Sequence, residues 1–337
     1  MKKFELTDPP PFLRGVYIRD DIDFDERGST SAQQPSTPKP KFSQPEEPEK
    51  PQLSAMMSDD EFLQSLMPTQ ETESLEPSPA IGDETEDEAS SLASEIEPLT
   101  PELAGLTRRE KFPFNFPWIE ELNLEFPNAV TFFVGENGSG KSTLLEAIAG
   151  LSGFPVWGGG RNDLPDQFGP ERESVLAQAM YPYFKKRPRD GYFFRAEYHA
   201  QFASLLDARK RDKGFKEDPY KRYGGQSLHT QSHGESFLAL MESRLTKGLF
   251  LLDEPESALS PKRQLSLLAL MLDRIKKGNS QFIVATHSPI LMTFPGATVF
   301  SFDSPSLEPI DYRLSEHFQL TKGILDYPEK YWKHLHE

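Results

Sequence analysis

The sequence GENGSGKS at residues 135–142 constrains this chain more than any other stretch. Its three glycines allow the backbone to wrap closely around a phosphate group, with the N–H groups pointing inward. An apolar run at residues 129–134 precedes it, and residues 142–149 follow with the apolar spacing of a helix. Because the N-terminal end of a helix favours anions, this strand, turn and helix together predict a phosphate-binding loop.

Two side chains at the end of this loop have the chemistry that a nucleotide requires. We expect the Lys141 ammonium group to reach the β- and γ-phosphates and the Ser142 hydroxyl to bind Mg²⁺. A glycine-rich turn that binds nothing is the alternative, which the strand before it and the helix after it make much weaker. The candidate nucleotide-binding residues of the loop are Gly135, Glu136, Asn137, Gly138, Ser139, Gly140, Lys141, Ser142 and Thr143.

A second apolar run, GLFLLDE at residues 248–254, ends in two carboxylates. A short continuous apolar run is typical of a central strand in a parallel sheet that is covered on both faces. Such a strand delivers Asp253 to the carboxyl edge of the sheet, where it can hold Mg²⁺ through water, and Glu254 is suited to polarise an attacking water. An acidic pair that only caps the strand end is the alternative, and the phosphate loop makes it the weaker one.

The motif TQSHGES contains a helix start. Ser232 and Glu235 have the spacing of a capping box in front of an apolar helix. A helix N-terminus with an exposed serine and a glycine, here Gly234, can also hold a γ-phosphate. The structural and the functional interpretations are compatible, so Ser232, Gly234 and Glu235 are candidate nucleotide-binding residues.

The motif ATHSP begins at the end of a third apolar run, QFIVAT, and contains His287. A lone histidine is usually structural or solvated. His287, however, is expected at the carboxyl edge of the sheet, at the position where a side chain can contact the γ-phosphate. We therefore favour a functional role for it.

The acidity of the chain is concentrated in residues 28–107. This segment has 17 acidic and three basic residues, and so it carries −14 of the formal net charge of −16. It is rich in Pro, Ser and Glu, and such a composition cannot bury enough apolar surface to offset its ordering entropy. We expect a long disordered acidic insertion in a loop, which could bind a protein partner.

Strands that alternate with helices predict an α/β fold, and antiparallel strands at the start and end predict a mixed sheet with flanking helices. We expect strands 12–19 and 122–126 to pair in one sheet with the strand at 129–134. Three further expectations are a helix end before a turn at residues 188–191, a strand at 192–196, and a helix capped by Ser260 that buries Leu265, Leu268, Leu272 and Ile275.

Four elements of this chain occur in the same order as in the ABC-type ATPases, which the chain therefore resembles. The phosphate loop is followed by SHGES at the position of the family's signature, LLDE at that of the Walker B strand and ATHSP at that of the switch histidine. The resemblance covers residues 112–300. More closely, the runs VTFFVGENGSGKSTLLEAIA, QSHGESFLAL, LLDEPESALSP and QFIVATHSPIL are similar to those of small stand-alone bacterial ATPases with an AAA/ABC-type domain.

This resemblance implies a P-loop NTPase fold of the ABC-ATPase type and a division of the chain. Residues 1–27 would supply an N-terminal strand of the ATPase domain, residues 28–107 the insertion, and residues 108–337 the ABC-type domain. A small helical subdomain is expected at residues 153–245.

The resemblance also implies a mechanism in which two subunits enclose two ATP molecules head to tail. Each γ-phosphate would contact Lys141 of one subunit and Ser232 with Gly234 of the other. Glu254 would act as general base, and His287 would stabilise charge during the transfer. ATP is then the substrate, Mg²⁺ the cofactor, and a homodimer the active form.

Three positions depart from the family pattern. The D-loop SALS ends in Ser260 where the family usually has Asp. No residue is an obvious Q-loop glutamine. The candidates are the region near Glu197 and, as alternatives, Gln167, Gln178 and Gln201. The aromatic side chain that would stack on adenine is open among Phe112, Phe114, Phe116 and Trp118.

The process that the ATPase drives has several alternatives. An ATPase subunit of a membrane transporter is one, and an ATPase of a nucleic-acid-acting or defence complex is another, which the basic runs KKRPR and RKRDKGFK favour weakly. A nucleotide-gated scaffold with very slow hydrolysis is the third. Since the chain has no cysteine and no apolar run of about 20 residues, we expect a cytoplasmic protein without membrane insertion.

Overall fold

The computed structural model describes residues 10–19, 111–161, 174–195 and 233–335, with scattered positions between 204 and 227. The acidic segment 28–107 and Ser232 lie outside the described residues. The insertion therefore stays a prediction.

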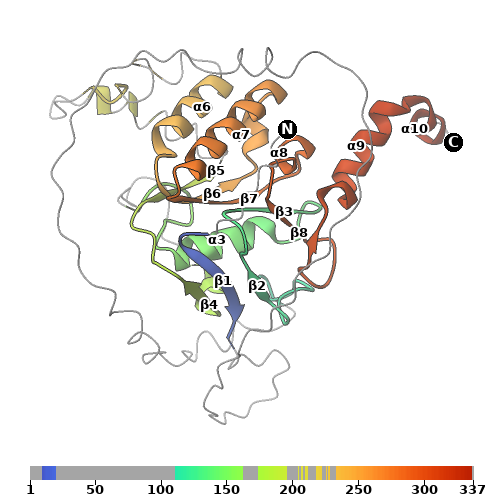
Figure 1. The fold of residues 1–337 in the computed structure, drawn as a ribbon, viewed down its shortest axis with the longest axis horizontal. Helices are drawn as coiled ribbons and strands as arrows, with labels where there is room; N and C mark the ends of the chain where they lie inside the picture. The colour runs from blue at the N-terminus through green and yellow to red at the C-terminus, as the bar shows by residue number, and fades with distance from the viewer. Residues whose placement is uncertain are drawn as a thin grey trace, which may run out of the picture.

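A six-stranded sheet forms the centre of the chain (Figure 1). Its strand order is β5-β6-β7-β3-β8-β9, and all neighbours are parallel except the last pair. The mixed α/β sheet that the sequence predicts is thus confirmed. The strands are β3 (Val130–Val134), β5 (Gly191–Arg195), β6 (Gly248–Asp253), β7 (Ser280–Ala285), β8 (Thr298–Ser301) and β9 (Pro309–Ile310).

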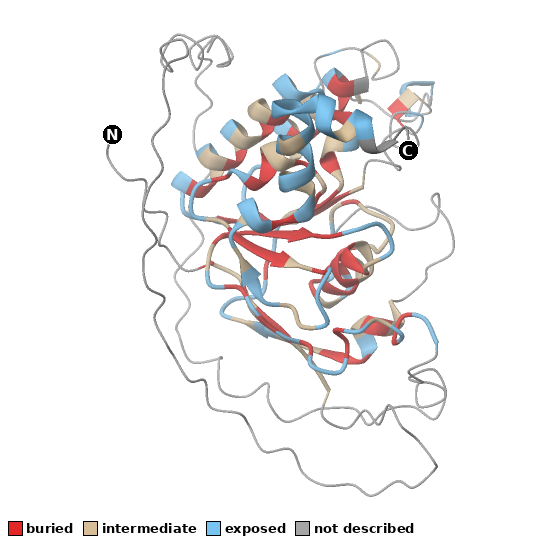
Figure 2. Ribbon diagram, turned by 90° about the vertical axis from the view of Figure 1, so that its right-hand side faces the viewer, coloured by how far each residue is buried: buried red, intermediate tan, exposed pale blue. Residues whose placement is uncertain are grey.

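Helices cover both faces of this sheet because its central strands are apolar on both sides. In β6, Phe250 packs in the core cluster with α6 and α7, whereas Leu251 packs in the cluster with α3. Figure 2 shows the buried strands between these layers. The helices are α6 (His233–Arg244), α7 (Pro261–Lys276) and α8 (Pro289–Met292) on one face, and α3 (Lys141–Leu151) on the other.

A second, three-stranded antiparallel sheet packs beneath α3, in the order β2-β1-β4. The predicted strand at 12–19 is confirmed as β1 (Leu13–Ile18), and it pairs with β2 (Asn123–Glu125). Its expected place in one sheet with β3 is wrong, because the two sheets are separate. The Gln281 side chain joins them, since its amide donates to the Leu13 carbonyl and accepts from the Leu13 N–H, both at 2.8 Å.

Two other expectations need correction. The predicted helix end before residue 188 is the strand β4 (Met180–Phe184), whose Tyr and Phe side chains favour a strand. With β4 and β5 in it, the stretch 153–245 is not wholly helical; it also includes the short helix α4 (Val175–Gln178).

The buried face of α7 also differs from the expected one. Its fully buried row is Gln264, Leu267, Met271 and Ile275, whereas Leu265, Leu268 and Leu272 are half-buried. The reason is that α7 contacts both the sheet and α6, so its apolar stripe is wide. The centre of that stripe lies one residue away from the predicted row. Ser260 and Pro261 begin the helix as predicted.

The C-terminal tail is helical and projects beside the body (Figure 1). A short 3₁₀ helix, η5 (Tyr312–Leu314), leads into α9 (Glu316–Asp326) and α10 (Pro328–Leu335). A 3₁₀ helix η4 (Pro255–Ala258) follows β6.

Candidate functional site

The phosphate loop lies between the end of β3 and the start of α3. Gly138 and Gly140 have φ angles of 81° and 99°, which favour glycine. A Cβ at Gly140 would lie 2.6 Å from the Trp118 ring, so that residue also needs to be small. Trp118 donates its indole N–H to the Ser139 carbonyl at 2.9 Å. The loop is therefore shaped by its own glycines and by the aromatic wall beneath it.

Lys141 is buried inside the curl of this loop. Its ammonium group donates to the carbonyls of Gly135 at 2.7 Å and of Glu136 at 2.8 Å. Burial lowers the pKa of Lys141, and the nearby carboxylates, Glu254 first, oppose this effect. Asp303, after β8, accepts from the Glu136 N–H at 2.7 Å and holds the start of the loop from outside. Sequence reasoning did not find Asp303.

Ser142 and Asp253 meet as expected, at the carboxyl edge of β6. The Ser142 hydroxyl donates to the Asp253 carboxylate at 2.8 Å. Burial raises the pKa of Asp253 to about 6, and Arg195 and the hydrogen bond from Ser142 oppose the rise. A buried carboxylate beside a hydroxyl fits Mg²⁺, which takes one or two carboxylates together with substrate phosphates. No three His, Cys, Asp or Glu side chains gather into a metal site in the part of the chain that the structure describes.

Arg195 is a charged group at this edge that the sequence did not reveal. It ends β5, directly opposite Asp253 in the parallel register. Its Nε lies 3.6 Å from Asp253 Oδ2, and one of its terminal nitrogens lies 2.5 Å from Glu146 Oε1 on α3. The strand was predicted, but its register with β6 follows only from the tertiary fold. Of the Q-loop candidates, Glu197, Gln167 and Gln201 lie outside the described residues, and Gln178 is exposed on α4.

Glu254 and His287 face each other across the same edge. Glu254 has φ 46° and ψ 53°, a strained conformation for a residue other than glycine. Its N–H donates to the Ala285 carbonyl at 2.9 Å, and its Oε1 lies 3.4 Å from His287 Nε2. Burial lowers the pKa of His287, the Lys141 cation and His317 lower it further, and Glu254 opposes this. The His287 ring is therefore neutral at neutral pH.

Two further residues contact His287, and neither was predicted. Glu256 accepts the His287 backbone N–H at 2.5 Å. His317, on α9, lies with its Nε2 2.8 Å from His287 Nδ1. No local sequence signal marks His317, which is one of seven histidines in the chain.

The predicted signature residues lie away from this cluster. Gly234 packs against the Ala258 carbonyl, and Glu235 pairs with Arg263 of α7 at 2.8 Å. These contacts hold the start of α6 against η4 and α7. The structure thus brings Lys141, Ser142, Asp253, Glu254 and His287 together. Gly234 and Glu235 are at the start of α6, a helix that lies across the sheet from α3 (Figure 1).

The four aromatic candidates for adenine stacking differ in exposure. Phe114 and Trp118 are buried, at 0% and 1% exposed. Phe116 stacks on Trp118 with 5.2 Å between ring centroids, and Phe112 lies edge-on to Phe116 and is 70% exposed. Phe112 and Phe116 are therefore the two that present a ring surface near the loop.

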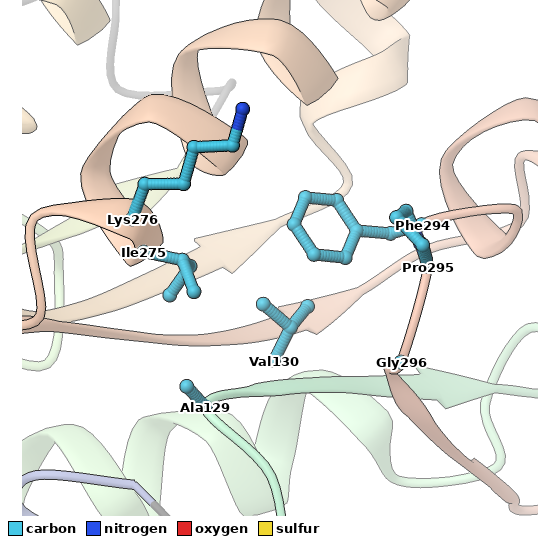
Figure 3. Close-up of a pocket in the computed structure, with 7 residues that line it drawn as sticks. All are labelled: Ala129, Val130, Ile275, Lys276, Phe294, Pro295 and Gly296. Atoms are coloured by element: carbon cyan, nitrogen blue, oxygen red, sulfur yellow. The ribbon is translucent and has the colours of Figure 1, made fainter. Parts of the chain in front are cut away.

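A small pocket lies at the opposite, amino end of β3 (Figure 3). Its volume is about 70 Å³, well below the range of about 300–1,000 Å³ typical of nucleotide-sized ligands. It is lined by Ala129, Val130, Ile275, Lys276, Phe294, Pro295 and Gly296. The carboxyl edge of the sheet remains the candidate site. None of the described helices is long and apolar enough to cross a membrane.

Two stretches of this chain match protein-family models. Residues 176–293 match a family model described as an AAA domain, putative AbiEii toxin, Type IV TA system, and residues 114–161 match a second AAA-domain model. These two stretches contain the phosphate loop, Asp253, Glu254 and His287.

Several curated relatives are ATP-binding proteins of transporters, and others are the DNA replication and repair protein RecF of Leptospira interrogans, 58% identical over 38 residues. The probable branched-chain amino acid transport ATP-binding protein LivF of Archaeoglobus fulgidus is 31% identical over 174 residues, which cover 44% of this chain and 64% of that protein. A probable iron chelatin transport ATP-binding protein of Helicobacter pylori is 28% identical over 202 residues, covering 52% and 73%. The chain thus spans less than two thirds of the LivF relative.

Among solved structures, an ATP-binding cassette of an ABC transporter in its ADP conformation is 14% identical, with a TM-score of 0.35. The match covers 64% of this chain and 91% of that one. The family matches, the curated relatives and the geometry of the loop agree in one likeness: the chain resembles P-loop ATPases of the ABC/AAA type.

Proposed function

We propose that this chain hydrolyses ATP with Mg²⁺ and that ATP draws two copies into a head-to-tail dimer. One observation carries the proposal: Lys141, Ser142, Asp253, Glu254 and His287 converge at the carboxyl edge of β3, β6 and β7. Such a cluster has a cation for phosphate, ligands for Mg²⁺, a base and a neutral imidazole.

The roles follow from the contacts of each group. The loop N–H groups and Lys141 would bind the phosphates, once the ammonium group exchanges its two loop carbonyls for phosphate oxygens. Ser142 and Asp253 would hold Mg²⁺, which when bound neutralises charge on the phosphates.

The remaining two groups would act on the attacking water and the transferred phosphoryl group. Glu254 would orient the water and accept its proton, since its carboxylate is partly exposed at the mouth of the site. His287 Nε2, 3.4 Å from that carboxylate, would donate to a γ-phosphate oxygen. The remaining loop residues, Asn137, Ser139 and Thr143 among them, would contribute backbone and side-chain donors to the phosphates.

The place of the signature supports a dimer. Gly234 and Glu235 are held against η4 and α7, in the helix layer across the sheet from α3, which favours a second copy as the source of these donors for a phosphate at Lys141. Two copies arranged head to tail would each supply Ser232 and Gly234 to the other's ATP. Assembly then completes the site and switches hydrolysis on.

The test is the mass in solution of Glu254→Gln, measured by light scattering with and without Mg-ATP. Removing the base should leave ATP bound but uncleaved, so we expect a shift from monomer to dimer on adding Mg-ATP. The double variant Lys141→Ala/Glu254→Gln is the matched control and should stay monomeric. ATP binding by Glu254→Gln without a change in mass would contradict the dimer proposal.

A second candidate concerns the process that hydrolysis drives. Some curated relatives are named as transport ATP-binding proteins, which favours a role as a transporter subunit, and others, which match over 38 residues, as the DNA replication and repair protein RecF. The loop after β4 instead exposes Lys185, Lys186, Arg187 and Arg189, a basic run that could bind a phosphate backbone. DNA binding that weakens with salt, and is lost when these four residues become alanine, would favour the nucleic-acid role. The acidic segment 28–107 stays a predicted binding segment for a protein partner, and a cytoplasmic location stays part of this proposal.

A further inference from the structure

The switch histidine His287 is held by a second histidine from the far end of the chain. His317, in the first turn of α9, lies with its Nε2 2.8 Å from His287 Nδ1, and the ring centroids are 4.6 Å apart. The same His317 nitrogen is 4.0 Å from Glu136 Oε1 in the phosphate loop. The start of α9 therefore lies against both the loop and the histidine of the ATP site.

The contacts of the other His287 atoms decide which ring donates. A neutral imidazole carries a proton on only one of its two ring nitrogens. The hydrogen-bond partners of the two nitrogens decide which of them is protonated. His287 Nε2 faces a carboxylate oxygen of Glu254 at 3.4 Å, so a lone pair at Nε2 would face negative charge. A proton at Nε2 is favoured instead, and His287 Nδ1 is then an acceptor. His317 Nε2–H then donates this hydrogen bond to His287 Nδ1.

Burial makes this choice of tautomer relevant at neutral pH. The pKa of His287 is lowered by burial first and then by Lys141 and His317, while Glu254 opposes the shift. The ring is then neutral in the working protein, and only one of its two tautomers presents an N–H towards Glu254. Glu256 contacts His287 through the backbone N–H of that residue, so this hydrogen bond fixes the backbone rather than the ring.

The first turn of α9 is built to hold His317 in place. Ser315 caps the helix, is 4% exposed, and donates its hydroxyl to the Tyr312 carbonyl at 2.7 Å. Phe318 packs edge-on against the Tyr312 ring at 5.4 Å. Beyond this turn the helix is exposed, with Leu320 and Leu325 at 53% and 75%. The anchored part of α9 is thus the part that carries His317.

We propose that His317 is a positioning residue that orients His287 and keeps the proton of that ring on Nε2, so that the C-terminal helix α9 completes the ATP site in cis. This inference rests on the proposed function, in which His287 Nε2–H donates to the γ-phosphate. It has the consequence that a movement of α9 would change hydrolysis through the orientation of His287.

The first test reads the ring directly. In the full chain with ¹⁵N-labelled histidine rings at pH 7.5, two-bond ¹⁵N–¹H spectra separate protonated from unprotonated ring nitrogens. His287→Gln assigns the signal among the seven histidines. We expect His287 to have a protonated Nε2 and an unprotonated, hydrogen-bonded Nδ1. A proton on Nδ1, or a His287 ring signal that does not change in His317→Ala, would overturn the proposal.

The second test compares steady-state hydrolysis in three variants. His317→Ala should lower kcat about ten- to a hundredfold, the range for losing a group that orients a histidine, with little change in KM. His317→Gln should keep most of the wild-type kcat, because its amide N–H can take the place of Nε2–H. Glu316→Gln, at the exposed neighbouring position of the same turn, is the control and should match the wild type.

The outcomes separate this inference from the proposed function. If Glu254→Gln abolishes hydrolysis and His317→Ala does not lower it, the proposed function stands and the role of His317 is refuted. A His317→Gln variant as slow as His317→Ala would also refute the hydrogen-bond role. If the wild type does not hydrolyse ATP, the proposed function fails, and the His287 tautomer still decides the inference.

Discussion

The phosphate loop and the helix α9 reach the same site by different routes. The loop is local: residues between β3 and α3 form its curl, and glycines with positive φ give it its shape. The histidine of α9 arrives 30 residues after its partner His287, and its place depends on Ser315 and Tyr312. The comparison teaches that the loop proposed to bind phosphate is specified by its local sequence, whereas the residue proposed to orient His287 is placed by tertiary packing.

The two regions also differ in how they are held. Gly140 lies against the rings of Trp118 and Phe116, which leave no room for a side chain there. Most of α9 is exposed after its first turn. Changes in the loop should therefore affect both stability and chemistry, and changes along most of α9 should affect neither.

The largest difference in ATP turnover should come from replacing one lysine by alanine in each region. Lys141→Ala removes the cation that would bind the β- and γ-phosphates, and we expect turnover to fall by about 10²- to 10³-fold. Lys322→Ala on α9 removes an exposed lysine that pairs with Asp326 one turn on, and turnover should stay unchanged. The measurement is phosphate release at saturating Mg-ATP. Equal turnover in both variants would mean that Lys141 has no part in the reaction.

The same contrast separates what the sequence predicts from what it does not. The strands β3, β6 and β7, the helix α3 and the loop were predicted because their apolar runs and glycines act over short distances. The roles of Lys141, Asp253 and Glu254 follow from the carboxyl ends of those strands. They stay predictions, and the contacts between their side chains support them.

Features that depend on distant packing were missed. Arg195 enters the site through its register with β6, and Asp303 through the end of β8. His317 depends on how a tail helix docks on α8. The strand β4 replaces the predicted helix end: its Tyr and Phe side chains favour a strand, but its partner β1 lies about 165 residues earlier in the chain, so the pairing follows only from the tertiary fold.

The next largest effect tests the packing of the loop rather than its chemistry. Gly140→Ala forces a side chain onto φ 99° and against Trp118 at 2.6 Å, so the free energy of unfolding should fall by about 2 to 3 kcal/mol. Gly138→Ala, in the same loop, has φ 81° but no neighbour within 4 Å. That control should cost only about 1 kcal/mol. Urea unfolding of both variants checks this, and equal losses would show that the Trp118 wall does not limit the loop.

The smallest effect concerns the stability cost of burying the Asp253 carboxylate, the proposed Mg²⁺ ligand. Because burial raises the pKa of Asp253 to about 6, the folded chain binds this proton more tightly than the unfolded chain does. Its contribution to stability therefore falls as pH rises from about 4 to about 6, and the loss persists above that range. Asp253→Asn keeps an acceptor for Ser142 without the charge, so in metal-free buffer it should raise the free energy of unfolding by about 1 to 2 kcal/mol at pH 7.5. The gain should shrink towards pH 4, while Mg-dependent hydrolysis is lost. A gain that is the same at both pH values would show that the charge of Asp253 is not what costs stability, and that Arg195 already compensates for it.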